Sequence, residues 1–262
     1  MNEWLVTIFL GLLEGVTEFL PISSTGHLLL AEHLFGVKRT ELFIVGIQSG
    51  ALLAVLLIYA PRLRGMLVGE MGGAGKSYLM KLGAAFVLTG VLGLVAMKMG
   101  LKLPEDPKVI AWTLMVGGGL ILVAEAWLKR HEGHDYPGWG AALAMGASQM
   151  LAAVFPGTSR SGASILAGMF GGLSRPAATD FSFLLGIPTL FAACGVSFYR
   201  QLKTVGVPRQ EEWLHLGLGF VVSGVTAYFV VRWLLGYVRT KTFNPFGWYR
   251  IALGLVWLVL VK

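Results

Sequence analysis

The chain has 262 residues, of which 55% are hydrophobic and 13% are charged, and its mean hydropathy is +0.71. A soluble domain carries roughly 25% charged residues, so the composition excludes a soluble globular protein and predicts a membrane protein. The net charge of +7 could suggest nucleic acid binding, but many Lys and Arg residues lie in short connections, such as Arg62, Arg64, Lys76 and Lys81. There we expect them to contact anionic lipid headgroups, not nucleic acid.

Residues 3–36 form the first unusual region. Two apolar arms flank a break at Pro21-Ile-Ser-Ser-Thr-Gly-His27. Each arm is short for a bilayer core, which needs about 20 apolar residues of helix. Because non-helical backbone at membrane depth survives only when it is buried in protein or faces a watery cavity, we predict a re-entrant helical hairpin.

The rest of the chain predicts six spanning helices and a second hairpin. The second hairpin covers 139–172 and breaks around Pro156-Gly-Thr-Ser-Arg160-Ser-Gly. The expected fold is therefore all-α, a polytopic helical membrane protein. The six predicted spans are 42–60, 79–97, 109–128, 178–199, 213–235 and 247–261.

The two hairpin regions align with each other. The predicted unit is one membrane domain, 1–262, with internal repeats of approximately 1–130 and 136–262. Each repeat holds one hairpin and three spans, so the second should be inverted, with the two tips meeting near the midplane. Chance similarity is the alternative, and the even charge distribution does not orient the chain. The matches are Gly11 with Gly146, Glu14 with Gln149, Pro21 with Pro156 and Ser24 with Ser159 at a shift of 135, and Gly46-Ile47 with Gly186-Ile187 at 140.

Glu14 and Glu18 are the residues of the first hairpin whose burial in an apolar environment costs the most free energy. Four residues apart, they share one helix face, and two carboxylates in an apolar hairpin repel unless a proton or cation lies between them. We interpret them as a proton-handling pair or as ligands of a divalent cation. The alternative is a structural pair buried against backbone donors or Arg160.

The first break supplies groups that bind an anion. Ser23, Ser24, Thr25 and Gly26 stand where the second arm begins, and hydroxyl and N–H groups at a helix start bind phosphate. Ordinary N-capping is the alternative. His27, which could also be a packed core histidine, lies within one turn of this start and in the same hairpin as both carboxylates.

The second break supplies a positively charged side chain. Arg160 offers a planar fork of donors suited to phosphate, and pairing with Glu14 or Glu18 alone is the structural alternative. Ser159 and Ser161 flank it, and Gly157 lets the backbone approach an oxyanion. Together the two breaks hold the parts for phosphoryl transfer: a clamp, a nucleophile and a proton-handling carboxylate.

Weaker signals do not change this interpretation. Gly69–Ser77 ends like a phosphate-binding loop, but its first glycine would have to stand at Glu70. The histidine-rich stretch 131–135 is interpreted as a solvated loop. The lone Cys194 excludes a disulfide framework and a cysteine-based metal site.

The stretches Glu14-Gly-Val-Thr-Glu18-Phe-Leu-Pro-Ile-Ser-Ser-Thr-Gly-His27 and Pro156-Gly-Thr-Ser-Arg-Ser-Gly-Ala-Ser164 closely resemble the two signature motifs of the undecaprenyl-diphosphate phosphatase family, the bacitracin-resistance type. Ala124-Glu125 and the stretch from Phe181 to Pro188 also look familial. Ser164 stands where the family pattern has Thr, and Asp180 where Glu is common; both departures keep the functional group.

The resemblance implies removal of the terminal phosphate of undecaprenyl diphosphate, which regenerates the monophosphate carrier for cell-wall synthesis and underlies bacitracin resistance. It implies a bacterial inner-membrane location, with the active site open toward the outer face. The expected catalytic residues are Ser24, His27, Glu18, Glu14 and Arg160. Ser24 is the favoured nucleophile, with His27 as its general base and acid. His27 itself is the second choice of nucleophile. Substrate-binding residues are Ser23, Thr25, Gly26, Gly157, Ser159, Ser161 and Ser164.

No organic cofactor is expected, but Mg²⁺ or Ca²⁺ on Glu14 or Glu18 is compatible with the resemblance. The expected partners are the polyprenyl diphosphate, membrane lipids and a second copy in a homodimer, and no nucleic acid. The main alternative function is a polyprenyl-phosphate transporter, because inverted repeats with broken helices are typical of transporters. A purely structural membrane protein does not explain why ionisable residues collect at both breaks.

Overall fold

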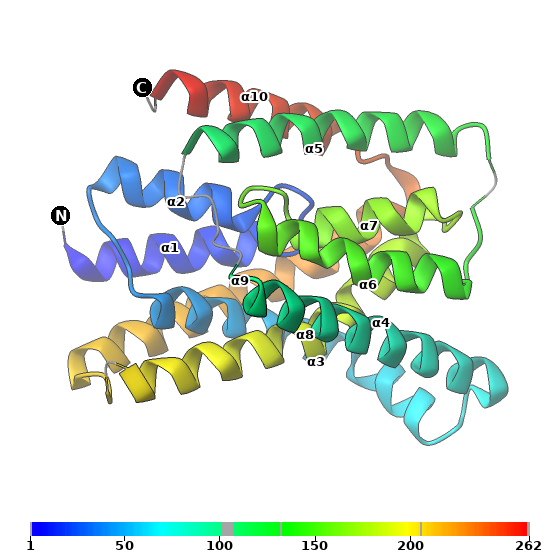
Figure 1. The fold of residues 1–262 in the computed structure, drawn as a ribbon, viewed down its shortest axis with the longest axis horizontal. Coiled ribbons are helices and arrows are strands. Elements are labelled where there is room, and N and C mark those ends of the chain that lie inside the picture. The colour runs from blue at the N-terminus through cyan, green and yellow to red at the C-terminus, as the bar shows by residue number, and fades with distance from the viewer. Residues whose placement is uncertain (1, 101–106, 132, 205, 261–262) are drawn as a thin grey trace.

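The computed structural model describes residues 2–100, 107–131, 133–204 and 206–260, and these residues fold into helices joined by short connections (Figure 1). The all-helical prediction is confirmed for this part of the chain. The helices are α1 (Glu3–Thr17), α2 (Ser24–Phe35), α3 (Glu41–Leu67), α4 (Gly72–Lys98), α5 (Pro107–Leu128), α6 (Trp139–Val154), α7 (Arg160–Phe170), α8 (Arg175–Thr204), α9 (Gln210–Thr240) and α10 (Asn244–Leu260).

Five helices within the described ranges are long and apolar enough to cross a membrane: α3, α4, α5, α8 and α9. They contain the first five predicted spans. The sixth predicted span, 247–261, falls in α10, whose described residues number 17, and its last residue lies outside the described part. Many large apolar side chains face outward, Leu57, Val87 and Phe229 among them, as expected where lipid is the solvent. The chain is a multi-pass membrane protein.

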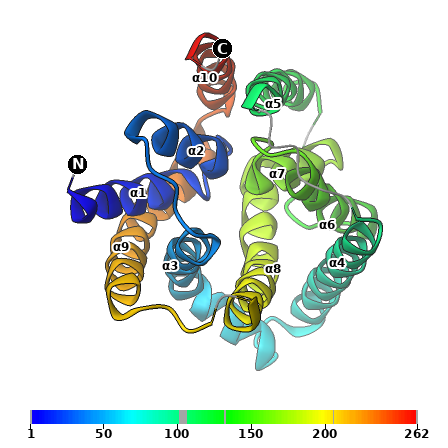
Figure 2. The ribbon, with the colours of Figure 1, turned by 60° about the vertical axis from the view of Figure 1, so that its left-hand side comes forward.

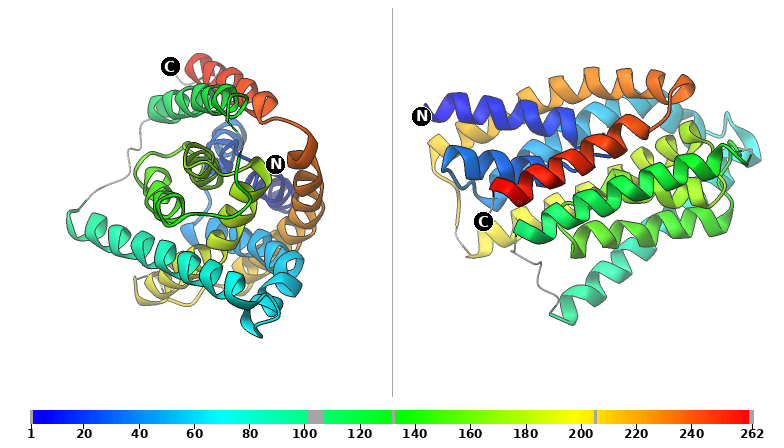
Figure 3. Two further views of the ribbon diagram at one scale, coloured as in Figure 1. Left: turned by 90° about the vertical axis from the view of Figure 1, so that its right-hand side faces the viewer. Right: turned by 90° about the horizontal axis from the view of Figure 1, so that it is seen from above.

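The two broken regions form the helical hairpins α1–α2 and α6–α7. Each hairpin packs against helices that are distant in sequence: α1 lies along α9, and α6 lies along α4. Seen end-on in the left panel of Figure 3, the α6–α7 hairpin lies between α4 and the α5–α10 pair. Figure 2 shows α5 and α10 side by side at one edge of the molecule. Each hairpin tip is thereby enclosed by protein.

Glycines allow the hairpins to approach their neighbours closely. A Cβ on Gly11 would stand 2.9 Å from the carbonyl oxygen of Gly219 in α9, and one on Gly146 would stand 2.5 Å from that of Ala85 in α4. Small residues permit such contacts between membrane helices. The two glycines that align between the predicted repeats therefore make the same kind of contact.

Candidate active site

The two hairpin tips share one backbone feature. Ser23 and Ser159 have φ values of 74° and 71°, and they are the non-glycine residues with positive φ in the described chain. Each caps the next helix: Ser23 Oγ accepts from Gly26 N at 3.2 Å, and Ser159 Oγ accepts from Gly162 N at 3.1 Å. Such a backbone costs about 1–3 kcal/mol and is concentrated at functional sites.

The two serines that cap the helices are not the pair that the sequence alignment matched. That alignment matched Ser24 with Ser159, whereas the capping serines are Ser23 and Ser159. The second tip has one more residue between its proline and its cap. Arg160, the first residue of α7, therefore occupies the position that Ser24 occupies in α2.

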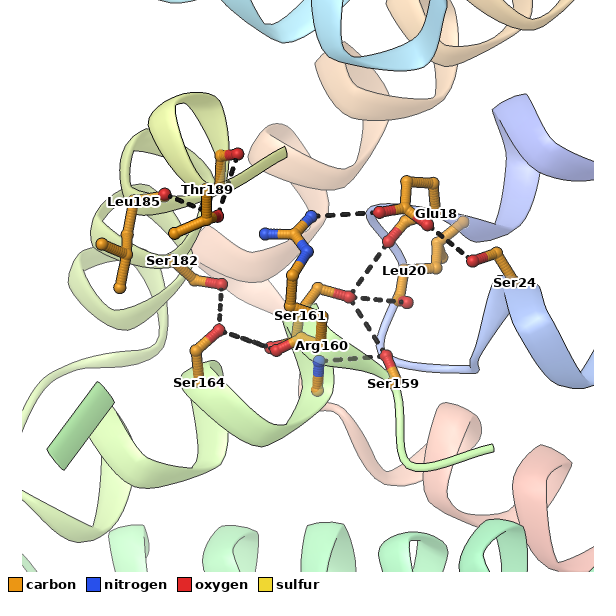
Figure 4. A network of polar contacts seen from close by, with 12 residues as sticks. Glu18, Leu20, Ser24, Ser159, Arg160, Ser161, Ser164, Ser182, Leu185 and Thr189 are labelled. Atoms are coloured by element: carbon orange, nitrogen blue, oxygen red, sulfur yellow. Dashed lines mark hydrogen bonds and ion pairs between the residues drawn. The ribbon is translucent and has the colours of Figure 1, made fainter. Parts of the chain in front are cut away.

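Glu18 joins the two tips. Ser24 Oγ donates a hydrogen bond to Glu18 Oε2 at 2.5 Å, and Arg160 Nη2 donates to Glu18 Oε1 at 3.1 Å. Figure 4 shows the Arg160 guanidinium extending toward Glu18, with Ser24 on the far side of the carboxylate. One carboxylate thus contacts a hydroxyl from the first hairpin and a guanidinium from the second.

Two donor atoms of Arg160 remain free. Its Nε and Nη1 are buried and have no hydrogen-bond partner. Buried donors are almost always satisfied, so these two are incomplete without a further acceptor. The pair with Glu18 expected as a structural alternative is present, but it uses only Nη2.

A cavity of about 520 Å³ borders these groups, and its lining includes Glu18, Ser24 and Arg160. Four predicted substrate-binding residues, Ser23, Thr25, Gly157 and Ser159, also line this cavity. The free arginine donors and the N-termini of α2 and α7 make this region suited to an anion.

The other predicted serines contact protein. Ser161 Oγ lies 3.1 Å from the carbonyl oxygens of Glu18 and Leu20, which links the second tip to the first (Figure 4). Ser164 Oγ lies 2.6 Å from Ser182 Oγ on α8. Neither residue is among those lining the cavity, nor is Gly26. In this structure Ser161 and Ser164 hold the backbone that presents Arg160.

Neither ring nitrogen of His27 is hydrogen bonded to Ser24. Its Nδ1 lies 2.7 Å from the carbonyl oxygen of Ser23, and its Nε2 lies 2.6 Å from the hydroxyl of Tyr249. The ring also stacks on Tyr249, with 5.6 Å between centroids. Both nitrogens are therefore occupied beside the tip, whereas the partner of the Ser24 hydroxyl is Glu18.

Glu14 lies one turn before Glu18 on α1 and is fully buried. Both of its carboxylate oxygens lack a hydrogen-bond partner. A buried carboxylate in that state needs a proton or a cation. The described residues contain no group of three or more His, Cys, Asp or Glu placed to hold a metal.

Arg250 was missed by the sequence reasoning. Its five N–H donors reach five carbonyl oxygens at 2.9–3.3 Å, so the buried guanidinium is fully satisfied. It joins both tips to α5. The available signal was an arginine inside the predicted span 247–261, where an ionisable residue is costly. The acceptors are Pro21, Gly157, Thr158, Thr113 and Leu114.

We expect Arg250→Lys to lower both the thermal stability and the activity of the purified protein. A lysine has three donors and cannot reach five carbonyls. Those of Pro21, Gly157 and Thr158 lie outside the helices, and each buried acceptor left unpaired there costs about 1–3 kcal/mol of unfolding free energy. The thermal midpoint in detergent would be compared with that of Arg239→Lys, which changes an exposed arginine of α9. Equal midpoints in the two variants would contradict the role given to Arg250.

Gly186 of α8 leaves the space that the Arg160 guanidinium occupies. A Cβ on Gly186 would lie 2.5 Å from Arg160 Nη1. We expect Gly186→Ala to displace the guanidinium and to lower kcat/KM by about 10- to 100-fold, the usual effect of a small misplacement in a catalytic site. Gly195→Ala on the same helix, where a Cβ meets nothing within 4 Å, is the matched control and should have normal activity. Normal activity in Gly186→Ala would show that the position of Nη1 is unimportant.

Comparison with known proteins extends the similarity beyond the two motifs. The family model for "Bacitracin resistance protein BacA" matches residues 7–256. A protein of Xylella fastidiosa named undecaprenyl-diphosphatase is 45% identical over 259 residues, covering 98% of both chains. Proteins of the same name from Rhizobium johnstonii and Xanthomonas euvesicatoria are 46% and 44% identical and cover 98% of this chain and 96% and 98% of their own lengths.

Proposed function

Because this chain belongs to the family of the bacitracin resistance protein BacA, we propose that it is an undecaprenyl-diphosphate phosphatase. It removes the terminal phosphate of the lipid diphosphate and returns the monophosphate carrier to cell-wall synthesis. The observation that carries this proposal is the pair of free, buried donors on Arg160, placed next to the Ser24–Glu18 hydrogen bond. A diphosphate supplies the acceptors that those donors lack.

Ser24 is the nucleophile in this proposal, and Glu18 is its base. As Ser24 Oγ attacks the terminal phosphorus, its proton passes to Glu18 Oε2, to which it is already hydrogen bonded. The bond from that phosphorus to the bridging oxygen breaks, and the polyprenyl monophosphate leaves with the electron pair. Glu18 can then protonate the leaving oxygen.

The second step restores the enzyme. Water attacks the phosphoserine, Glu18 takes a proton from the water, and the bond between Ser24 Oγ and phosphorus breaks. The proton returns to Ser24, and inorganic phosphate is released. Arg160 stabilises the charge on the equatorial phosphoryl oxygens in both steps, together with the N–H groups at the starts of α2 and α7.

The expected base, His27, receives a different role in this proposal. Its hydrogen bonds to Ser23 and Tyr249 fix the first tip against α10, and so it positions Ser24. His27 as the nucleophile is the competing scheme. It requires the ring to leave Tyr249, whereas Ser24 needs no such rearrangement.

A divalent cation is compatible with the two glutamates. The unpartnered oxygens of Glu14 and the neighbouring Glu18 would hold Mg²⁺ or Ca²⁺, whose preferred ligands are oxygens. Diphosphate oxygens would have to complete the ligand set. Such an ion would offset negative charge between substrate and carboxylates, while Glu14 without it would hold a proton.

For the fold we propose six spans and two re-entrant hairpins, arranged as an inverted repeat. The packing supports it: α1 with α9 corresponds to α6 with α4, and α3 with α9 corresponds to α8 with α4. A further sequence match supports it as well. At a shift of 134, Phe86-Val-Leu-Thr-Gly90 of α4 falls on Phe220-Val-Val-Ser-Gly224 of α9.

We also place the protein in the bacterial inner membrane, with its site open toward the outer face. Membership of this family supports a location in the membrane. The cavity is lined by Gly93 of α4 and Ala193 of α8, in the halves of these helices that lead to Lys98 and Thr204. The outer face would therefore be the end of the molecule where α4 and α8 finish.

Phosphate release separates the phosphatase from a transporter. Purified protein in detergent has no compartments, so a protein that only moves polyprenyl phosphate gives no chemical product. We expect this purified protein to release inorganic phosphate from C55 and C15 diphosphates. Comparing the rates with and without chelator tests whether a divalent cation is needed. A pure preparation that binds the lipid diphosphate but releases no phosphate would favour the transporter.

A further inference from the structure

The cavity at Arg160 does not end at the polar groups. It continues between α4 and α8 along an apolar wall, and Gln149 lies on the lining of the same cavity. Gln149 is 4% exposed, and its Nε2 is a buried donor without a partner. An acceptor for this donor would have to come from the diphosphate, because a hydrocarbon chain has none. The apolar wall includes Phe86, Gly90 and Gly93 of α4, Met150 of α6, and Leu190 and Ala193 of α8.

The glycines of α4 keep this groove open. A Cβ on Gly90 would meet nothing within 4 Å, and the nearest atom to one on Gly93 is Met150 Sδ at 4.0 Å. Neither glycine is needed for helix packing, unlike Gly146, which touches α4 through its backbone. Because they lack side chains on the cavity side, they leave room for another molecule.

In the corresponding interface of the other half of the chain, α3 and α9 touch beside a groove of about 440 Å³. Gly224 of α9 corresponds to Gly90 in the match of α4 with α9. A Cβ on Gly224 would lie 3.0 Å from the carbonyl oxygen of Gly50 in α3, so there α3 and α9 approach each other closely. The surface groove beside this pair is lined by Leu53, Phe220 and other apolar residues, and by none of the candidate phosphate ligands. Of these two interfaces, the α4–α8 interface is the one whose cavity lining includes Arg160.

We propose that the α4–α8 groove binds the first isoprene units of the substrate's polyprenyl chain, while the diphosphate contacts Arg160 and Ser24. The inference rests on the proposed function and adds where the lipid part of the substrate lies. The groove is continuous with the candidate phosphate site, so a diphosphate held there directs its chain along the apolar wall. Only 11% of the apolar window of α4 is buried, and the rest of a long chain passes across this helix into the bilayer.

Filling the groove tests this assignment. We expect Gly90→Leu and Gly93→Leu to raise the KM for C15 and C55 diphosphates about tenfold, with a much smaller change in kcat, because they remove chain binding that is equal in the ground state and the transition state. Gly83→Leu is the matched control: it lies on the same helix, meets nothing within 4 Å and is not on the cavity lining. Its KM should equal that of the unchanged protein. Unchanged KM in both groove variants would overturn the proposal.

Labelling with a modified substrate tests the site without relying on turnover. A C15 diphosphate with a diazirine on its chain should label residues 86–93 and 189–193 of the purified protein, and Gly90→Leu should reduce this labelling at least threefold. Labelling of 50–57 and 220–229 instead would place the chain in the α3–α9 groove and refute the proposal. If the protein releases no phosphate but the label still maps to the α4–α8 groove, the proposed phosphatase function fails while the chain-binding site stands.

Discussion

Replacing Arg160 by alanine should lower kcat/KM for C55 diphosphate by about 10³-fold or more, the range found when a charge-stabilising donor is removed from a phosphoryl-transfer site. The reason is specific to this arginine. It holds Glu18 with one nitrogen and has two buried nitrogens left for the phosphate. Alanine removes the proposed phosphate ligand and also leaves Glu18 without its positively charged partner.

Arg160→Lys separates these two effects. A lysine can keep an ion pair with Glu18, but it lacks the planar fork that serves Glu18 and a phosphate together. We expect it to accumulate in membranes normally and to retain little activity. Phosphate release should be compared at equal amounts of folded protein, judged by the thermal midpoint. Activity within about threefold of the unchanged protein in both variants would remove Arg160 from the site.

Glu18→Gln should lower kcat by about 10²- to 10⁴-fold, the range typical for loss of a general base, and Ser24→Ala should lower it at least as much, because it removes the nucleophile. Glu18→Gln keeps the shape of the side chain but cannot accept the proton of Ser24. Since the two residues act as a unit, the double variant should be little worse than either single variant. Single-turnover measurements of phosphate release would show this directly.

Strictly additive losses in the double variant would mean that Ser24 and Glu18 act in separate steps. Thr25→Ala is the suitable control for Ser24→Ala, because it removes a hydroxyl one residue later on the same helix start and on the same cavity lining. Thr25 is expected to bind substrate but has no role in the proposed proton transfer, so Thr25→Ala should change KM more than kcat. A loss in Thr25→Ala as large as that in Ser24→Ala would point to a general disturbance of the tip.

Local patterns of residues were enough to predict much of this molecule. Interruption of apolar runs by Pro21 and Pro156 predicted where two helices would break, and the described helices α1, α2, α6 and α7 have those breaks. Ionisable residues are costly in an apolar setting, so Glu18 and Arg160 stood out, and the structure brings them to 3.1 Å. The family resemblance carried by the two motifs is confirmed over nearly the whole chain.

Other features depend on contacts between distant segments, and these could not be predicted. The five carbonyl partners of Arg250 come from both tips and α5. No pattern in the sequence around Arg250 shows that α10 packs beside the two hairpin tips. The space that Gly186 leaves for Arg160 is invisible for the same reason. The sequence favoured the nearby His27 as the base for Ser24, and it did not show that the Ser24 hydroxyl donates its hydrogen bond to Glu18 across the turn.

In the proposed mechanism, Ser24 takes the terminal phosphate while Glu18 removes the proton of Ser24 beside Arg160. The most direct test is to mix the purified protein with C55 diphosphate and to stop the reaction within milliseconds with a denaturant at neutral pH, which preserves phosphoserine and the acid-labile phosphohistidine. The phosphate is then located by peptide mass spectrometry without acid steps. The mechanism predicts a phosphoryl group on the peptide containing Ser24, absent in Ser24→Ala. Phosphate on His27, or full-rate phosphate release by Ser24→Ala, would contradict it.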